Sequence, residues 1–154
     1  MRLRVCAVGR LRRGPEKDLF DLYAARIAKA GRALALGPLD LSEFESPGTP
    51  AREGERLIRA VPEGAAVVAL DERGRTLSSP ELAAWLAARR DDGARDCAFL
   101  IGGADGLMPG LRDRADLVLS FGPMVWPHML ARAMLAEQLY RATQILAGTP
   151  YHRA

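Results

Sequence analysis

Two short apolar runs in the last third of the chain each end abruptly in a corner rich in glycine or proline. Residues 97–101 are followed by the glycine-rich stretch 102–106, and residues 117–121 are followed by 122–127, which holds one glycine and two prolines. Apolar runs bounded in this way are typical of buried strands that stop at tight loops. A helical pattern over 128–147 follows the second corner. The chain is therefore expected to bring two strand ends close to the start of a long helix.

The same alternation of strands and helices fills the rest of the chain. The run 65–70 has no polar alternation, as expected of a central strand covered on both faces. Ser78 and Glu81 have the spacing of a helix capping box. The predicted strands are 3–9, 33–41, 65–70, 97–101 and 117–121; the predicted helices begin at residues 15, 50, 79 and 128; a charge-rich turn is predicted over 71–75. This pattern predicts an α/β fold with a mainly parallel sheet and helices on both faces.

Length and composition favour one domain over residues 1–154, in the cytoplasm. A chain of 154 residues with 49% hydrophobic content suffices for one core. No apolar run approaches the roughly 20 residues needed to cross a bilayer, and no signal peptide is expected. The two cysteines, Cys6 and Cys97, fall in predicted strands and are expected to be reduced and buried. With two histidines and no Cys-x-x-Cys pair, no metal site is predicted.

The charge is modestly basic, and 20 of the 22 cationic residues are arginine. The sharpest local cluster, four cations between Arg10 and Lys17, lies just beyond the first predicted strand. Arg52, Arg56 and Arg59 form a row along a predicted helix. Each group is open to two interpretations, a solvated surface or an RNA contact, because nucleic-acid binding requires the arginines to converge on one face.

The two corners are the natural place for a ligand. In open parallel sheets, ligands bind outside the carboxyl ends of the strands, where glycine allows close approach of the backbone. The sequence Gly102-Gly103-x-x-Gly106 matches neither the dinucleotide fingerprint nor a phosphate-binding loop with its lysine. The expected ligand therefore has no phosphate chain.

Several separated motifs together resemble one known family. They are Leu70-Asp71-x-x-Gly74, Ser79-x-Glu81-x-Ala83, Ile101-Gly102-Gly103-x-x-Gly106-Leu107, Pro127-His128, Glu137-Gln138-Leu139-Tyr140-Arg141-Ala142 and the closing Pro150-Tyr151-His152-Arg153. In combination they are similar to the ribosomal large-subunit methyltransferase H family, small SPOUT-class bacterial enzymes that methylate N3 of a pseudouridine in 23S ribosomal RNA. The similarity runs from the first strand to the last residues.

The resemblance implies a trefoil knot at the carboxyl end, S-adenosylmethionine bound by the knotted loops, and a homodimer whose partner subunit completes the site. The cofactor residues that it implies are Leu70, Gly102, Gly103, Gly122, Pro123, Met124, Val125, Trp126 and Pro127. Family members often carry threonine where this chain has Val125, so no side-chain role is assigned to that position.

The implied reaction needs either a base or a cation, because the N3 imide of a uracil ring is mostly protonated at neutral pH. His152 is the candidate base, with Arg153 as a stabiliser of the ring anion. His128, Arg141 and Tyr151 are candidates for substrate binding. In the alternative view, the tail only binds RNA and the proton leaves to water.

Two rival functions remain at this point. The first is a ribosome- or RNA-binding module that has the fold without the chemistry, for which failure to bind S-adenosylmethionine would be diagnostic. The second is a dinucleotide-binding oxidoreductase, which the missing fingerprint after the first strand disfavours.

Overall fold

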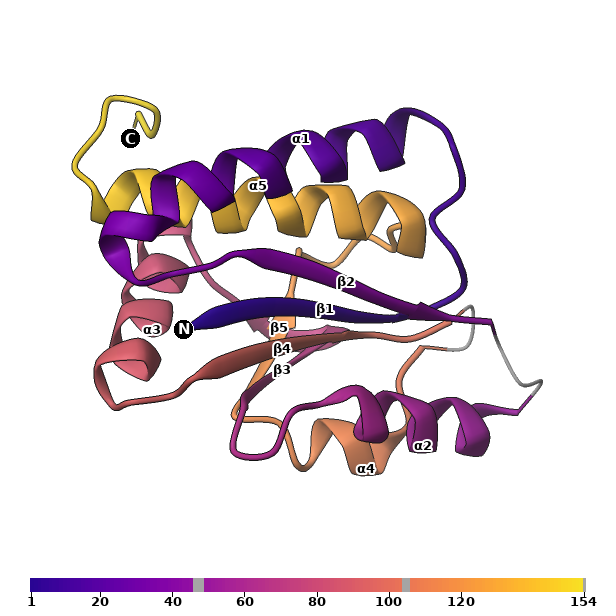
Figure 1. The fold of residues 1–154 in the computed structure, drawn as a ribbon. Coiled ribbons are helices and arrows are strands. Elements are labelled where there is room, and N and C mark those ends of the chain that lie inside the picture. The colour runs from indigo at the N-terminus through magenta and orange to yellow at the C-terminus, as the bar shows by residue number, and fades with distance from the viewer. Residues whose placement is uncertain (46–48, 104–105, 154) are drawn as a thin grey trace.

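The protein is built on one five-stranded parallel sheet (Figure 1). The computed structural model describes residues 1–45, 49–103 and 106–153, so the glycine corner at 102–106 lies partly outside the described residues. The strands are β1 (Arg2–Val8), β2 (Leu39–Phe44), β3 (Ala66–Thr76), β4 (Asp96–Ile101) and β5 (Leu117–Ser120), in the order β2-β1-β4-β3-β5. All four pairings are parallel. The prediction of a mainly parallel sheet is confirmed.

Helices cover both faces of the sheet, as predicted (Figure 1). The helices are α1 (Pro15–Ala30), α2 (Pro50–Ala60), α3 (Ser79–Asp91), α4 (Pro109–Arg112) and α5 (His128–Leu146), with a short 3-10 helix, η1 (Gly31–Leu34). A larger apolar core packs α1, α3 and α5 against one face, and a smaller one packs α2 and α4 against the other. Within the part of the chain that the structure describes, no helix combines the length and apolarity needed to cross a membrane.

Local chemistry explains where two of the helices begin. Thr49 Oγ1 accepts a hydrogen bond from the backbone N–H of Arg52, at 3.4 Å, and caps α2. At α3 the predicted capping box is present: Glu81 Oε2 accepts the Ser78 N–H at 2.7 Å, and Ser78 Oγ accepts the Glu81 N–H at 3.4 Å. These contacts satisfy backbone donors that a helix start leaves free.

The prediction of a strand over 33–41 is wrong in its first half. Gly31 to Leu34 form η1, Ala35 is left-handed with φ of 51°, and β2 begins only at Leu39. The apolar side chain of Leu36 is fully buried, and its N–H donates to the Gly31 carbonyl at 3.0 Å. Residues 33–36 are apolar because they pack under α1 as a tight turn. The spacing of apolar residues in the sequence cannot distinguish such a turn from a short strand.

The turn predicted over 71–75 is instead a bulge within β3. Leu70 and Arg75 both pair with Leu119 of β5, so the residues between them leave the ladder. At Gly74 the strands approach so closely that an added Cβ would lie 2.6 Å from the Val118 carbonyl oxygen. A bulge redirects side chains and twists the strand. Here it directs the charged segment that starts at Asp71 towards the carboxyl end of the sheet.

Replacing Gly74 with alanine should therefore destabilise the protein. The new methyl group meets backbone, which cannot move aside, so we expect a loss of roughly 1–3 kcal/mol of unfolding free energy, as for other overpacked sites. Urea denaturation measures this loss. Gly110→Ala is the matched control, because its added Cβ would meet no atom within 4 Å apart from its chain neighbours and the backbone of its own helix. Equal stability of the two variants would contradict the close approach seen at Gly74.

Candidate cofactor site at the carboxyl ends of the strands

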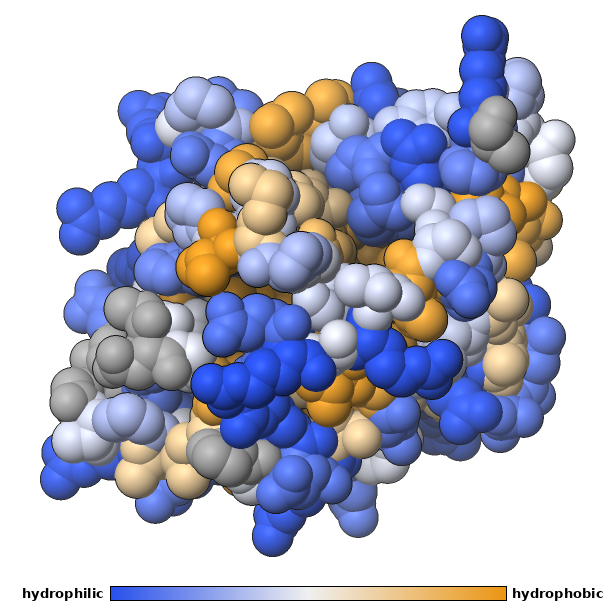
Figure 2. Space-filling view, turned by 180° about the vertical axis from the view of Figure 1, so that it is seen from behind, coloured by the Kyte–Doolittle hydropathy of each residue, from blue (hydrophilic) through white to orange (hydrophobic). Residues whose placement is uncertain are grey.

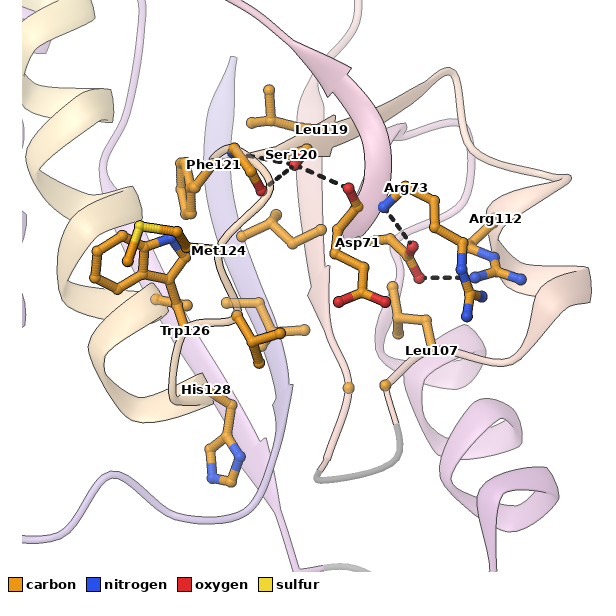
Figure 3. A pocket seen from close by; sticks show the side chains of 18 of the residues that line it. Asp71, Arg73, Leu107, Arg112, Leu119, Ser120, Phe121, Met124, Trp126 and His128 are labelled. Carbon is orange, nitrogen blue, oxygen red and sulfur yellow. Dashed lines mark hydrogen bonds and ion pairs between the residues drawn. The ribbon is translucent and has the colours of Figure 1, made fainter.

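A cavity of about 280 Å³ opens where β3, β4 and β5 end and α5 begins (Figure 3). Its lining residues are Leu70–Arg73, Ile101–Gly103, Gly106, Leu107, Arg112, Leu119–Gly122, Met124–Trp126, His128 and Ala131. Figure 3 shows Met124 and Trp126 on the side of α5, and Asp71 and Arg112 on the opposite side. The cavity thus combines apolar walls with a charged rim at one edge of the sheet.

Most of the predicted cofactor residues meet at this cavity. Those that line it are Leu70, Gly102, Gly103, Gly122, Met124, Val125 and Trp126. Pro127 lines an adjoining hollow together with Gly103 and His128, whereas Pro123 lines neither. The two corners are 20 residues apart in sequence, and the parallel sheet brings them together because the strands before them end at the same edge.

The first corner depends on close backbone contact. A Cβ on Gly102 would lie 2.4 Å from the backbone carbonyl group of Gly106, and the Gly106 N–H donates to the Gly103 carbonyl at 3.1 Å. Such an approach is possible only without a side chain. The backbone itself therefore forms this wall of the cavity.

The second corner is held by Ser120, a residue that the sequence analysis did not single out. Its hydroxyl accepts the Gly122 N–H at 3.1 Å and lies within donating distance of two carbonyl oxygens, that of Gly122 at 3.0 Å and that of Glu72 at 3.2 Å. The corner is thereby tied to the bulge of β3. Beyond it the loop is apolar and open, with Met124 64% and Val125 80% exposed.

An ion pair fixes the opposite wall. Asp71 Oδ2 lies 2.9 Å from Arg112 Nη1, and Asp71 Oδ1 accepts the Arg73 N–H at 3.0 Å. This ion pair joins the bulge of β3 to α4. Because the two side chains carry opposite charges, together they add no net charge to the cavity. Glu72 also lines the cavity and has no ion pair among the described residues. No group of three or more potential metal-ligating side chains occurs in the described ranges.

A buried arginine of α5 anchors this edge of the sheet. Arg132 is fully buried; Nη1 donates to the Gly9 carbonyl at 2.8 Å and to Glu43 Oε1 at 2.7 Å, and Nη2 donates to the Val8 carbonyl at 2.5 Å. A buried guanidinium is tolerated when it is paired and hydrogen-bonded in this way. Arg132 was not among the predicted site residues.

His128 lies one helical turn before Arg132 and lines the cavity. Burial lowers the pKa of its imidazole, the nearby Arg132 cation lowers it further, and Glu53 opposes the shift. The side chain is therefore neutral near pH 7.

The tail residues form a separate cluster. The Tyr151 hydroxyl donates to Glu137 Oε1 at 3.1 Å, and Arg141 Nη2 binds the same oxygen at 2.6 Å. The Arg141 guanidinium lies 4.9 Å from the centroid of the Tyr151 ring, and Nη1 is 3.5 Å from His152 Nδ1. Burial raises the pKa of Tyr151, and hydrogen bonding to Glu137 raises that of Arg141. Glu137, which organises the cluster, was not a predicted site residue.

The cavity lies at the start of α5, where His128 lines it, whereas the C-terminal tail follows the other end of the helix (Figure 1). Arg141 follows His128 by 13 residues, which is about 20 Å along a helix axis. Within one chain, His152 and Tyr151 do not line the cavity. The exposed Arg153 has no ion pair in the described part of the chain.

Comparison with known proteins decides the family. A family model described as "Predicted SPOUT methyltransferase" matches residues 1–152. The chain belongs to the SPOUT methyltransferase family. It is 63% identical to proteins named "Ribosomal RNA large subunit methyltransferase H" from Cereibacter sphaeroides and from Paracoccus denitrificans, in each case over 99% of both chains. The resemblance inferred from the motifs is confirmed, and the protein is a methyltransferase.

A solved structure supports the fold. The crystal structure of a probable methyltransferase from Bordetella pertussis Tohama I is 14% identical, covers 92% of this chain and 96% of its own, and superimposes with a TM-score of 0.54. Membership of a methyltransferase family removes the main support for the two rivals, the oxidoreductase and the binding module without chemistry.

Because the pKa of His128 is lowered in the folded protein, the unfolding free energy of this methyltransferase should depend on pH. In the unfolded chain the His128 imidazole takes up a proton near pH 6.5, whereas in the folded chain it does so only at a lower pH. The contribution of His128 to the unfolding free energy is therefore fully present above about pH 6.5 and is lost as the pH falls towards the folded pKa. Between pH 7.5 and 5.5 the wild-type protein should lose more unfolding free energy than His128→Gln. Urea denaturation at the two pH values measures both losses, and equal losses would contradict the prediction.

Proposed function

We propose that this enzyme transfers a methyl group from S-adenosylmethionine to N3 of a pseudouridine in 23S ribosomal RNA, acting on the assembled particle. The observation that carries the proposal is the 63% identity, along 99% of both chains, to proteins named as methyltransferases of large-subunit ribosomal RNA. The proposal includes one domain over residues 1–154, a carboxyl-terminal trefoil knot and a cytoplasmic location, where ribosomes work.

The residues of the cavity fit S-adenosylmethionine. Leu70, Leu107 and Leu119 offer apolar surface for an adenine ring, and the two corners offer backbone groups. When bound, this cofactor supplies an electrophilic methyl group on a positively charged sulfonium. A neutral His128 and the unpaired carboxylate of Glu72 suit a cationic ligand, since neither adds positive charge to the cavity. The lining contains no lysine, and of its two arginines, Arg73 and Arg112, the second is paired with Asp71.

The tail is proposed to present the target base. Glu137 and Arg141 hold Tyr151, so the segment that carries His152 and Arg153 is fixed against α5. In this position His152 accepts the N3 proton and Arg153 stabilises the ring anion. The alternative keeps the tail as an RNA contact and releases the proton to water.

A homodimer follows from the geometry of this proposal. Arg141 lies about 20 Å along α5 from His128, and Tyr151 and His152 do not line the cavity of their own chain, so the tail of a second copy is proposed to serve the cavity of the first. Exposed apolar side chains support such an interface, above all Met124 and Val125 beside the cavity. In Figure 2 apolar patches (orange) interrupt the hydrophilic surface (blue). Adjacent apolar side chains that are mostly exposed, such as Met124 and Val125, are candidates for an association site.

The function is tested by methyl transfer in vitro. Large ribosomal subunits from cells that lack the protein are incubated with the enzyme and S-adenosylmethionine, and mass spectrometry then locates the new methyl group. We expect one methyl on N3 of one pseudouridine. Gly102→Ala should bind cofactor at least about tenfold more weakly, because the added methyl group displaces the backbone of the first corner. A wild-type protein that modifies no ribosomal RNA would overturn the proposal.

A second prediction separates the two roles of the tail. Truncation after Pro150 should leave cofactor affinity within about twofold but abolish methyl transfer, because the cavity residues remain in place. His152→Gln should lower kcat by about 10²-fold or more if the imidazole accepts the proton. If the tail only binds RNA, the same variant should raise KM and leave kcat unchanged. Arg95→Ala, at an exposed position away from the tail and the cavity, controls for folding, and a truncated protein that turns over normally would refute both roles.

A further inference from the structure

We propose that Arg12 and Arg13, on the loop between β1 and α1, form a docking surface for the phosphate backbone of the RNA substrate. The inference rests on the proposed function and assigns it a binding surface outside the cavity and the tail. Both side chains are exposed, and neither has an ion pair among the residues that the structure describes.

The loop that carries these arginines is anchored at its base. Arg132 binds the carbonyl groups of Val8 and Gly9, and Glu43 Oε1 accepts the Leu11 N–H at 2.7 Å. The side chain of Leu11 is 6% exposed. Because the backbone is fixed on both sides of position 10 and Leu11 points into the core, the arginines that follow are held at the surface. A fixed base lowers the entropy lost when they bind a ligand.

The other charges near the loop are already engaged. Arg10 lies 3.7 Å from Glu45, and Lys17 pairs with Asp21. The nearest acidic residues along the chain, Glu16 and Asp18, lie in the first turn of α1, where the helix N-terminus stabilises carboxylates. Arg12 and Arg13 therefore remain as the free cations of the loop.

The loop lies beside the mouth of the cofactor cavity. It follows the carboxyl end of β1, and a Cβ placed on Gly9 would lie 3.6 Å from His128 Nε2, a side chain that lines the cavity. A polymer whose reactive base enters the cavity must place its backbone near this rim. Guanidinium groups match phosphate oxygens in charge and geometry, and phosphate contacts position a nucleic acid without reading its sequence.

The test compares two double variants that each remove two positive charges. Arg12→Ala with Arg13→Ala changes the proposed surface. Arg32→Ala with Arg95→Ala is the matched control, because both residues are exposed and lie towards the amino ends of the strands, Arg32 in η1 and Arg95 just before β4. Binding to unmethylated large ribosomal subunits is measured by co-sedimentation between 50 and 200 mM KCl, at about 25 °C. Cofactor affinity is measured in parallel by calorimetry.

We expect the variant with Arg12→Ala and Arg13→Ala to bind the large ribosomal subunits about tenfold more weakly. A plot of log K against log salt concentration should also be shallower by roughly 1–2, because each lost phosphate contact lowers the number of released counterions. The cofactor affinity of this variant and the binding of the control variant should match the wild type. Equal binding by the two variants would overturn the proposal. The proposed function fails separately, when the wild-type protein itself methylates no ribosomal RNA.

A crosslinking arm identifies the partner molecule. A benzophenone group on Arg13→Cys should crosslink to RNA in the particle, since the two natural cysteines are fully buried and escape labelling. Crosslinks to ribosomal protein alone would show a protein contact and overturn the assignment to phosphate.

Discussion

The buried guanidinium of Arg132 holds together the edge of the sheet on which this protein works. It ties the second turn of α5 to the end of β1 through Val8 and Gly9, and to β2 through Glu43. Leaving a charge of this kind without partners costs several kcal/mol, so the three elements are constrained to meet in one arrangement. The same contacts set the position of His128 beside the cavity and fix the base of the basic loop. One interaction therefore determines how the proposed cofactor site and the proposed RNA surface lie relative to each other.

An irregularity of the sheet makes the cavity possible. A regular β3 would continue along β5 and fill the space that Asp71 and Glu72 now border. Instead the strand bulges after Leu70, and the chain returns to Leu119 at Arg75. The bulge is stabilised by contacts that join it to its surroundings, the Asp71 to Arg112 pair and the Ser120 hydroxyl. Bulges are common next to active sites because they redirect a few side chains while the remaining ladder stays intact.

The sequence predicted the sheet and the location of the cavity because both depend on local patterns. The unbroken apolar run at 65–70 indicates a central strand, and the glycines at 102 and 103 mark a strand end. The partnership of Arg132 and Glu43 could not be predicted, because 89 residues separate them and each is an ordinary helix or strand residue by pattern. The bulge was mistaken for a turn because its charged residues and Gly74 have the composition of a turn. Glu137 was missed because its importance depends on Tyr151, which reaches it only through the folded tail.

The proposed division of labour follows from the rigidity of α5. The helix begins at the cavity, and Arg141 of the tail cluster lies in its second half. Because α5 is a continuous helix, its rise fixes the distance between His128 and Arg141. Arg141 contacts the Tyr151 ring and lies close to His152, so the tail packs against its own helix, where neither Tyr151 nor His152 lines the cavity. In the proposed dimer, a second copy docks on the exposed apolar loop at Met124 and Val125 and supplies its tail to the cavity from outside. In the proposed dimer, catalysis is a property of the pair, and the stiffness of α5 gives the tail of one copy a defined position relative to the cavity of the other.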